Sequence, residues 1–203
     1  MKKYHILLGL LLSFKSFAQN DSKTAFQKSR YELAVSYYKK ADFRKALDLF
    51  SIASKLKPEN ELGKESTKQV DALKTILRND VLSRVVGKWK LTGDKPTWAQ
   101  TTITSQNEIE EIIEINQDKI LFFETDKKTL IKKMVKSEDL KYYNKDVTDG
   151  VFSDIILSDG TIWSCLLDEE ANVLHVINIA KQTEKGIENI TSNNEEAYFV
   201  RIK

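Results

Sequence analysis

Cysteine, proline, histidine and glycine are all scarce in this sequence of 203 residues, which contains 1, 2, 2 and 7 of them respectively. A single cysteine excludes an intrachain disulfide framework and any multi-cysteine zinc site. Two histidines, one of them His5 near the N-terminus, leave little for a histidine-based metal site. With 41% hydrophobic and 31% charged residues, the chain has the composition of a folded protein, which excludes collagen and long disorder. The length predicts one large domain or two small ones.

Residues 1–18 have the three parts of a secretory signal peptide. Lys2 and Lys3 precede an apolar run at residues 6–12, and the small residues Ser16 and Ala18 precede an expected cleavage before Gln19. The apolar run is too short for a permanent membrane span, and no cysteine stands near the cleavage position to carry a lipid. We therefore expect an exported protein, periplasmic or extracellular, without a stable membrane anchor after cleavage. The alternative is that this segment forms a first core helix.

The charge of the expected mature chain is unevenly distributed. The segment 1–18 contains three lysines and no acid, so its removal leaves 29 basic and 30 acidic residues. Residues 19–86 carry 14 basic and 9 acidic side chains, whereas residues 87–203 carry 15 and 21. This split predicts two units with different surfaces. Neither half has the density of lysine and arginine typical of a nucleic-acid-binding protein, so we expect no nucleic-acid partner.

The spacing of apolar residues between positions 24 and 57 predicts a helical hairpin. One stripe comprises Phe26, Leu33 and Tyr37, and the other comprises Phe43, Ala46, Leu47, Phe50 and Ala53. Asp42 stands between them as a predicted N-cap, and Pro58 ends the second helix because the residue before a proline avoids the α region. Residues 61–84 have a third helical pattern, and we expect this helix to cap the pair.

The order of small and large residues in this hairpin follows the pattern of a known repeat. The matching positions are Leu33, Ala34, Tyr37, Phe43, Ala46, Phe50, Ala53 and Pro58. On these residues the hairpin resembles a single tetratricopeptide (TPR) repeat of about 34 residues, in which small residues let two helices approach closely. Two positions depart from the family pattern: Arg30 replaces a large aromatic residue, and Ala41 replaces the usual turn glycine. The following residues do not repeat the pattern.

The resemblance implies a protein-binding face on the first helix. The positions that would face a partner are Lys28, Tyr31, Val35, Tyr38 and Lys39. This set is aromatic and basic, which favours an acidic peptide or a chain-terminal carboxylate as the ligand. The alternative is that Tyr31 and Tyr38 pack on the third helix or on the second domain.

After residue 86 the pattern changes to short runs of β-branched and aromatic residues separated by turn signals. The runs predict strands at residues 88–92, 109–116, 119–125, 128–136, 151–158, 161–167, 173–180, 187–191 and 197–202. Asp159-Gly160 is the strongest hairpin signal. Short connections between so many strands predict an antiparallel meander that closes into a small barrel. The expected fold class is therefore α+β: a signal peptide at 1–18, a helical region at 19–86, and an antiparallel β-barrel at 87–203.

The first predicted strand opens with Gly87-Lys88-Trp89, and the last contains Arg201, the only arginine among residues 87–203. This opening resembles the Gly-x-Trp strand of the lipocalin superfamily. In that family the tryptophan plugs one end of the barrel and an arginine from the last strand lies across it. The resemblance implies that Arg201 lies over Trp89 as a cation–π pair worth about 1 kcal/mol. The alternative is a chance match on an open β-sandwich.

Cys165 and His175 are the one thiol and the one imidazole expected after cleavage. If residues 168–172 form the turn, Cys165 opposes His175, and one face carries Trp163, Cys165, Leu167, Val173, His175 and Ile177. A Cys–His pair can activate a thiolate nucleophile, but this face is otherwise apolar. We therefore interpret Trp163, Cys165, His175 and Ile177 as ligand-lining residues. A change of one residue in the turn would separate Cys165 from His175.

These observations favour an exported, non-enzymatic binding or scaffold protein of the cell envelope. The helical region would bind a protein partner, and the β domain would bind a ligand or a second partner. The alternative is a carrier that holds a small apolar, lipid-like molecule in its barrel, and a Cys/His hydrolase is a more distant third. No catalytic residue, metal or cofactor is expected.

Overall fold

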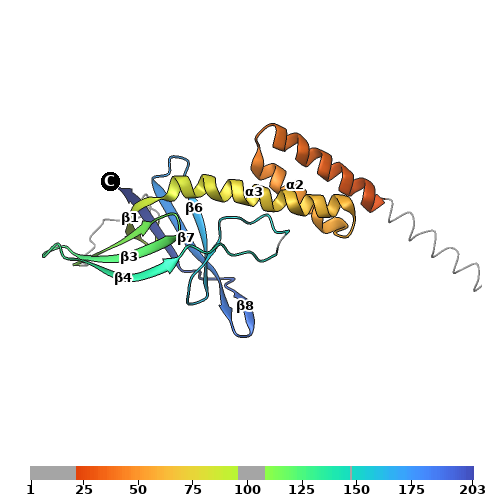
Figure 1. Ribbon diagram of the computed structural model, residues 1–203. Coiled ribbons are helices and arrows are strands. Elements are labelled where there is room, and N and C mark those ends of the chain that lie inside the picture. The colour runs from red at the N-terminus through yellow and green to blue at the C-terminus, as the bar shows by residue number, and fades with distance from the viewer. Residues whose placement is uncertain (1–21, 96–107, 147) are drawn as a thin grey trace, which may run out of the picture. The chain divides into compact units, whose positions relative to one another are not determined.

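A computed structural model describes residues 22–95, 108–146 and 148–203 of the chain (Figure 1). The predicted signal peptide therefore lies outside the described residues. The described chain forms two compact units. The first, the helical unit, comprises the chain up to Leu77 together with Lys145–Gly150, and the second, the sheet unit, comprises Arg78–Asn144 and Val151–Lys203.

The helical unit contains a helix at residues 22–39, α2 (Phe43–Leu56) and the first part of α3 (Glu61–Val85). The first helix ends in two overlapping turns, in which Asp42 N donates to Tyr37 O and Ala41 N donates to Tyr38 O, both at 3.0 Å. Ala41 has φ 58°, the left-handed conformation that this type of helix end requires. Asp42 then caps α2 as predicted, because its carboxylate accepts from Lys45 N at 3.3 Å. The sequence therefore places both helix ends correctly.

Small residues allow the helices of this unit to pack closely. Ala34, Ala46 and Ala53 are completely buried, and Phe50 fills the space beside them. The predicted stripe on the first helix is wrong in part, since Phe26 and Leu33 are exposed while Gln27 and Ala34 form the buried side. The stripe is displaced because α2 packs on the adjacent side of the helix.

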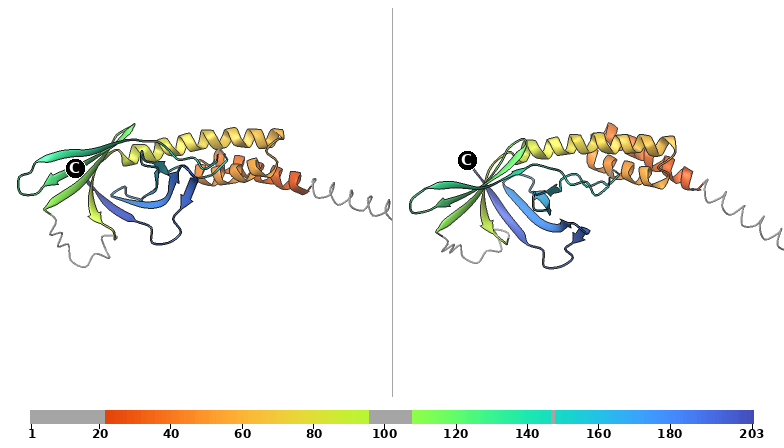
Figure 2. Two further views of the ribbon diagram at one scale, coloured as in Figure 1. Left: turned by 90° about the horizontal axis from the view of Figure 1, so that it is seen from below. Right: turned by 60° about the horizontal axis from the view of Figure 1, so that its bottom comes forward.

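The sheet unit is built from nine described strands, all paired antiparallel (Figure 2). They are β1 (Gly87–Gly93), β2 (Ile109–Ile115), β3 (Lys119–Asp126), β4 (Lys132–Asp139), β5 (Ile155–Ile156), β6 (Thr161–Leu167), β7 (Val173–Thr183), β8 (Gly186–Asn189) and β9 (Glu196–Ile202). Their spatial order is β4-β3-β2-β1-β9-β7-β6-β5, and β8 pairs with β7. The α+β class and the antiparallel arrangement are thus as predicted.

Two turns explain where the strands begin. The predicted Asp159-Gly160 hairpin is confirmed: Leu157 N donates to Thr161 O at 2.9 Å, and Gly160 has φ 83°. β4 begins later than the predicted residue 128, because the preceding turn continues to Ile131, whose carbonyl accepts from Asp126 N at 3.1 Å.

The described sheet is not closed. β4 and β5 are its two terminal strands. The segment that follows β4 forms an isolated bridge with β5 between Tyr142 and Ile155. In addition, Ile156 N donates to Lys141 O at 2.9 Å. These contacts join the two ends of the sheet at one place without forming a continuous ladder.

The core of the sheet unit lies between the inward-facing sides of these strands. It consists of Val85, Trp89, Ile113, Ile115, Ile120, Ile155, Leu157, Leu174, Val176 and Phe199. The last turns of α3 pack against it through Val81, Leu82 and Val85. For this reason the compact units divide after Leu77 rather than at the expected boundary after residue 86.

Candidate functional site

Described residues in the apolar interior of the sheet unit enclose a small cavity of about 40 Å³. Trp163 and Cys165, two of the four predicted ligand-lining residues, belong to its wall. The other lining residues include Ile113, Leu174 and Val176. Phe122 packs edge-on against Trp163 with ring centroids 6.0 Å apart, so large side chains already occupy much of the interior.

The predicted register between β6 and β7 is wrong by one residue. Cys165 lies opposite Val176, and His175 lies opposite Leu166. The turn is longer than expected because the Asp168 carboxylate accepts from both Asn172 N, at 2.7 Å, and Val173 N, at 2.8 Å. Since side chains alternate along a strand, Cys165 and His175 lie on opposite faces of the sheet.

His175 and Ile177 are therefore not part of the cavity wall. On the other face, the His175 ring stacks on Tyr198 with centroids 4.1 Å apart and planes at 10°. His175 Nε2 lies 2.9 Å from a Glu196 carboxylate oxygen, to which the Tyr198 hydroxyl also donates at 3.0 Å. Ile177 shares this face, opposite Glu196 on β9. The Cys–His pair considered from the sequence is thus not formed.

Cys165 has the properties of a packing residue. Burial raises the pKa of its thiol to about 12, and the nearby Asp154 adds to this effect. A thiol with this pKa is almost completely protonated at neutral pH, and the thiolate is the reactive form. These properties suit a side chain that packs in the cavity wall.

Trp89 and Arg201 lie as the sequence predicts. They are direct neighbours on β1 and β9, and the Arg201 guanidinium carbon is 4.3 Å from the centroid of the Trp89 ring. Trp89 is completely buried, and its indole Nε1 donates to Val85 O at 2.7 Å. Arg201 also donates to the carbonyls of Val86, at 3.1 Å, of Ala171, at 2.9 Å, and of Arg84, which lies in α3. The pair therefore fixes the junction between α3, β1 and the β6–β7 turn.

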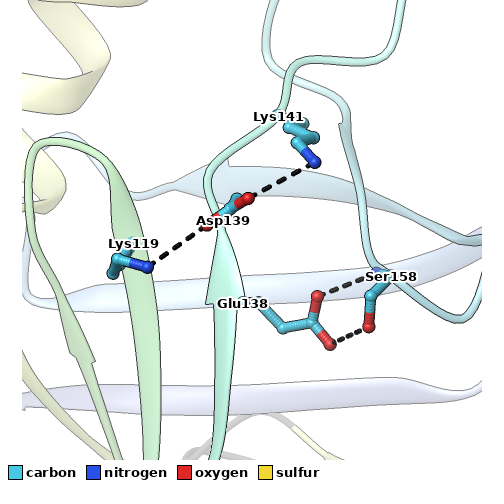
Figure 3. A network of polar contacts seen from close by, with 5 residues as sticks. All are labelled: Lys119, Glu138, Asp139, Lys141 and Ser158. Atoms are coloured by element: carbon cyan, nitrogen blue, oxygen red, sulfur yellow. Dashed lines mark hydrogen bonds and ion pairs between the residues drawn. The ribbon is translucent and has the colours of Figure 1, made fainter.

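A buried carboxylate joins the terminal strand β4 to the turn between β5 and β6 (Figure 3). The side chain of Glu138, on β4, is 2% exposed and accepts from Ser158 N at 2.8 Å and from Ser158 Oγ at 2.7 Å. Lys136 forms an ion pair with it at 2.7 Å. Burial alone would raise the pKa of Glu138, but the bonds from Lys136 and Ser158 hold it below its usual value. We call this group, Glu138, Ser158 and Lys136, the carboxylate clasp.

The outer side of the clasp is a polar hollow. The neighbouring Asp139 pairs with both Lys119 and Lys141, each at 3.3 Å, and these contacts lower its pKa (Figure 3). The hollow has a volume of about 360 Å³ and is lined by Ser137, Glu138, Asp139, Lys141, Ile156, Leu157 and Ser158. Because the acids in it are paired with lysines or with Ser158, we interpret these contacts as structural.

The predicted partner-binding face of the first helix is partly accessible. Lys28 and Lys39 are exposed, Val35 is half-buried, and Tyr38 is 43% exposed with its ring 5.5 Å from that of Phe43. Tyr31 packs edge-on against Phe50 at 5.4 Å. The aromatic contacts of Tyr31 and Tyr38 are thus with α2, and not with the third helix or the second domain named in the alternative expectation.

The sequence did not reveal a buried polar network in the helical unit. Gln27 is completely buried, and its amide nitrogen donates to Ala53 O at 2.9 Å and to Lys57 O at 3.1 Å. Asn60 donates to the Gln27 oxygen at 2.6 Å and accepts from Gly63 N at 2.7 Å. Gln27 thereby binds the C-terminal carbonyls of α2 and, through Asn60, the start of α3. The available sign of a helix start here is Asn60 itself, a preferred N-cap residue directly before the acidic Glu61.

Within the described residues, no group of three or more His, Cys, Asp or Glu side chains is placed to hold a metal ion. None of the helices in the described part of the chain is both long enough and apolar enough to cross a membrane. In comparisons with protein-family models, curated proteins and solved structures, nothing matches the chain.

Proposed function

We propose that the protein is an exported, non-enzymatic binding or scaffold protein of the cell envelope, and that its helical unit binds an acidic segment of a partner protein. The observation that supports this most is the filled interior of the sheet unit. Its cavity of about 40 Å³ is far smaller than the roughly 300 Å³ or more of a small-molecule site. A lipid-like ligand would have to displace core side chains, which disfavours the carrier alternative.

The chemistry of the first helix supports a protein partner. Tyr38 offers a large, half-exposed ring whose position is fixed by Phe43. Lys28 and Lys39 are exposed on the adjacent side of the same helix. A rigid aromatic ring next to flexible cations suits a segment that combines apolar and acidic side chains. The predicted signal peptide supports placing this interaction outside the cytoplasm.

We also propose that the sheet unit is a lipocalin-like barrel whose seam lies between β4 and β5. The Trp89–Arg201 pair supports this, as does the position of the last strand beside the first. At the seam, the Tyr142–Ile155 bridge and the carboxylate clasp take the place of a continuous ladder. On this view the barrel is a rigid, filled support rather than a container.

The partner proposal is tested by photo-cross-linking in cells, with a photoreactive residue at position 39 of the full chain. We expect a partner cross-linked through an acidic segment, and we expect the double variant Tyr38→Ala/Lys39→Glu to weaken binding of a synthetic peptide of that segment at least tenfold. Leu33→Ala is the matched control, because Leu33 is exposed on another side of the same helix. Binding that is lost in the control but kept in the double variant would contradict the proposal.

A further inference from the structure

The turn between β3 and β4 presents two aliphatic side chains to solvent. The last pair between β2 and β3 is Ile109 with Asp126, and Lys127 N donates to Glu108 O at 2.8 Å just beyond it. Leu130 is 77% exposed and Ile131 is 67% exposed, the two highest values among the large hydrophobic residues of the described chain. Single exposed aliphatic residues are ordinary on protein surfaces, but two adjacent ones at the end of a hairpin are not.

This turn is ordered by its own hydrogen bonds. The Asp126 carboxylate accepts from Lys128 N at 2.8 Å and from Thr129 N at 2.7 Å, and Leu130 N donates to Asp126 O at 2.8 Å. Leu130 has φ 59°, a conformation that glycine and asparagine adopt more easily than leucine. Leucine is thus disfavoured here both by its backbone conformation and by its exposure. Neither the backbone conformation of Leu130 nor its exposure contributes to the stability of the fold.

Lysines outnumber acids in the turn. Residues 126–133 contain Lys127, Lys128, Lys132 and Lys133 and one acid, Asp126, whose carboxylate accepts from the turn amides. Lys128 pairs with Glu108, and Lys132 lies over the ring of Phe123 at 3.7 Å from its centroid. Met134 and Val135 continue the exposed apolar surface along β4, a terminal strand of the sheet. The end of this hairpin is therefore apolar at its tip, with an excess of lysines over acids in the turn itself.

We propose that this hairpin tip binds the surface of a membrane that contains anionic lipid, with Leu130 and Ile131 inserted among the lipids and the lysines at the phosphate headgroups. Adjacent aliphatic side chains on a protruding turn need no complementary pocket in order to insert into a bilayer. Flexible lysines suit headgroups, whose positions are not fixed, and they bind an anionic surface additively. Two inserted side chains make such contact weak and reversible. This proposal does not depend on the partner site of the helical unit.

The first experiment is sedimentation with vesicles. The protein is expressed from the full sequence and purified in the form that the host cell produces. It is then mixed with either of two kinds of vesicle: phosphatidylcholine only, or phosphatidylcholine with phosphatidylglycerol. We expect at least tenfold stronger binding to the anionic vesicles, and at least a tenfold loss in the double variant Leu130→Asn/Ile131→Thr. Asparagine tolerates the left-handed conformation, so this variant should fold. Leu166→Asn is the matched control, because Leu166 is 51% exposed on β6. Equal losses in the double variant and the control would overturn the proposal.

A second measurement reports on the tip itself, so binding through any other part of the chain does not affect it. An environment-sensitive dye is attached to Thr129→Cys in a Cys165→Ala background, and the matched control carries the dye at Lys185→Cys, in the turn before β8. We expect anionic vesicles to shift the emission of the tip dye to the blue and to leave the control unchanged. No shift at position 129 would overturn the proposal. A tip shift caused by dimer formation without vesicles would also overturn it, since the surface would then join two copies of the chain.

Discussion

Replacing Ala41 by glycine should stabilise the helical unit, although the substitution removes a methyl group and changes no hydrogen bond. Ala41 occupies the left-handed position at the end of the first helix, with φ 58°. A residue with a Cβ atom pays roughly 1–2 kcal/mol for this conformation. Glycine avoids this cost, but it also gives the unfolded chain more conformational entropy, which lowers the free energy of unfolding by about 0.4–1 kcal/mol. The difference predicts a net stabilisation of about 0.5–1 kcal/mol for Ala41→Gly.

The assay is urea unfolding followed by ellipticity at 222 nm, which reports mainly on the helices. Tryptophan fluorescence is recorded in parallel, since Trp89 and Trp163 lie in the sheet unit. The matched control is Ala72→Gly, an exposed position within α3, where the same substitution should destabilise the protein by about 1 kcal/mol. Opposite signs for the two variants are expected. If Ala41→Gly also destabilises the helical unit, the assignment of a strained helix end is refuted.

Three further predictions concern the sheet unit. Because the pKa of Cys165 is raised to about 12, its thiol should react with a disulfide reagent at pH 8 roughly a hundredfold or more slowly than the same thiol in urea; equal rates would refute its burial. Glu138→Gln should cost about 1–3 kcal/mol at pH 7 in urea unfolding, because the hydrogen bonds to Ser158 lose their charged acceptor. Because the pKa of Glu138 is lowered from its usual value of 4.5, the ionised side chain stabilises the fold at pH values above 4.5. The difference in free energy of unfolding between wild type and Glu138→Gln should therefore shrink as the pH falls below 4.5. A difference that does not change with pH would contradict the proposed role of the ionised Glu138. Arg201→Met should cost about 3 kcal/mol, since it leaves three carbonyls without their donor and removes the contact with Trp89, whereas Arg201→Lys should recover part of this loss.

Local signals in the sequence were sufficient to predict most of the helices, strands and turns. Asp42 is recognisable as an N-cap because capping depends on only a few neighbouring residues. Asp159-Gly160 is recognisable as a turn for the same reason. The contact between Trp89 and Arg201, which are far apart in the sequence, could be expected only through the resemblance to lipocalins. The structure bears out that contact.

The candidate ligand site was less predictable, because a strand register depends on one residue in a turn. The Asp168 carboxylate binds two backbone amides and lengthens the β6–β7 turn, which moves His175 to the outer face and leaves Cys165 inside. The alternation of apolar residues did not settle this, since apolar side chains occur on both faces of β7. Similarly, Gln27 could not be expected in the core from the sequence, because its partners Ala53 and Lys57 lie on another helix.

The proposal that the sheet unit is a filled support rather than a ligand carrier is tested most directly by native mass spectrometry of the protein purified from its own host. We expect a measured mass equal to that of the polypeptide with no bound molecule. A lipid-like molecule that remains bound through purification, and is lost in Cys165→Phe, which would fill the cavity, would contradict the proposal and show that the protein is a carrier.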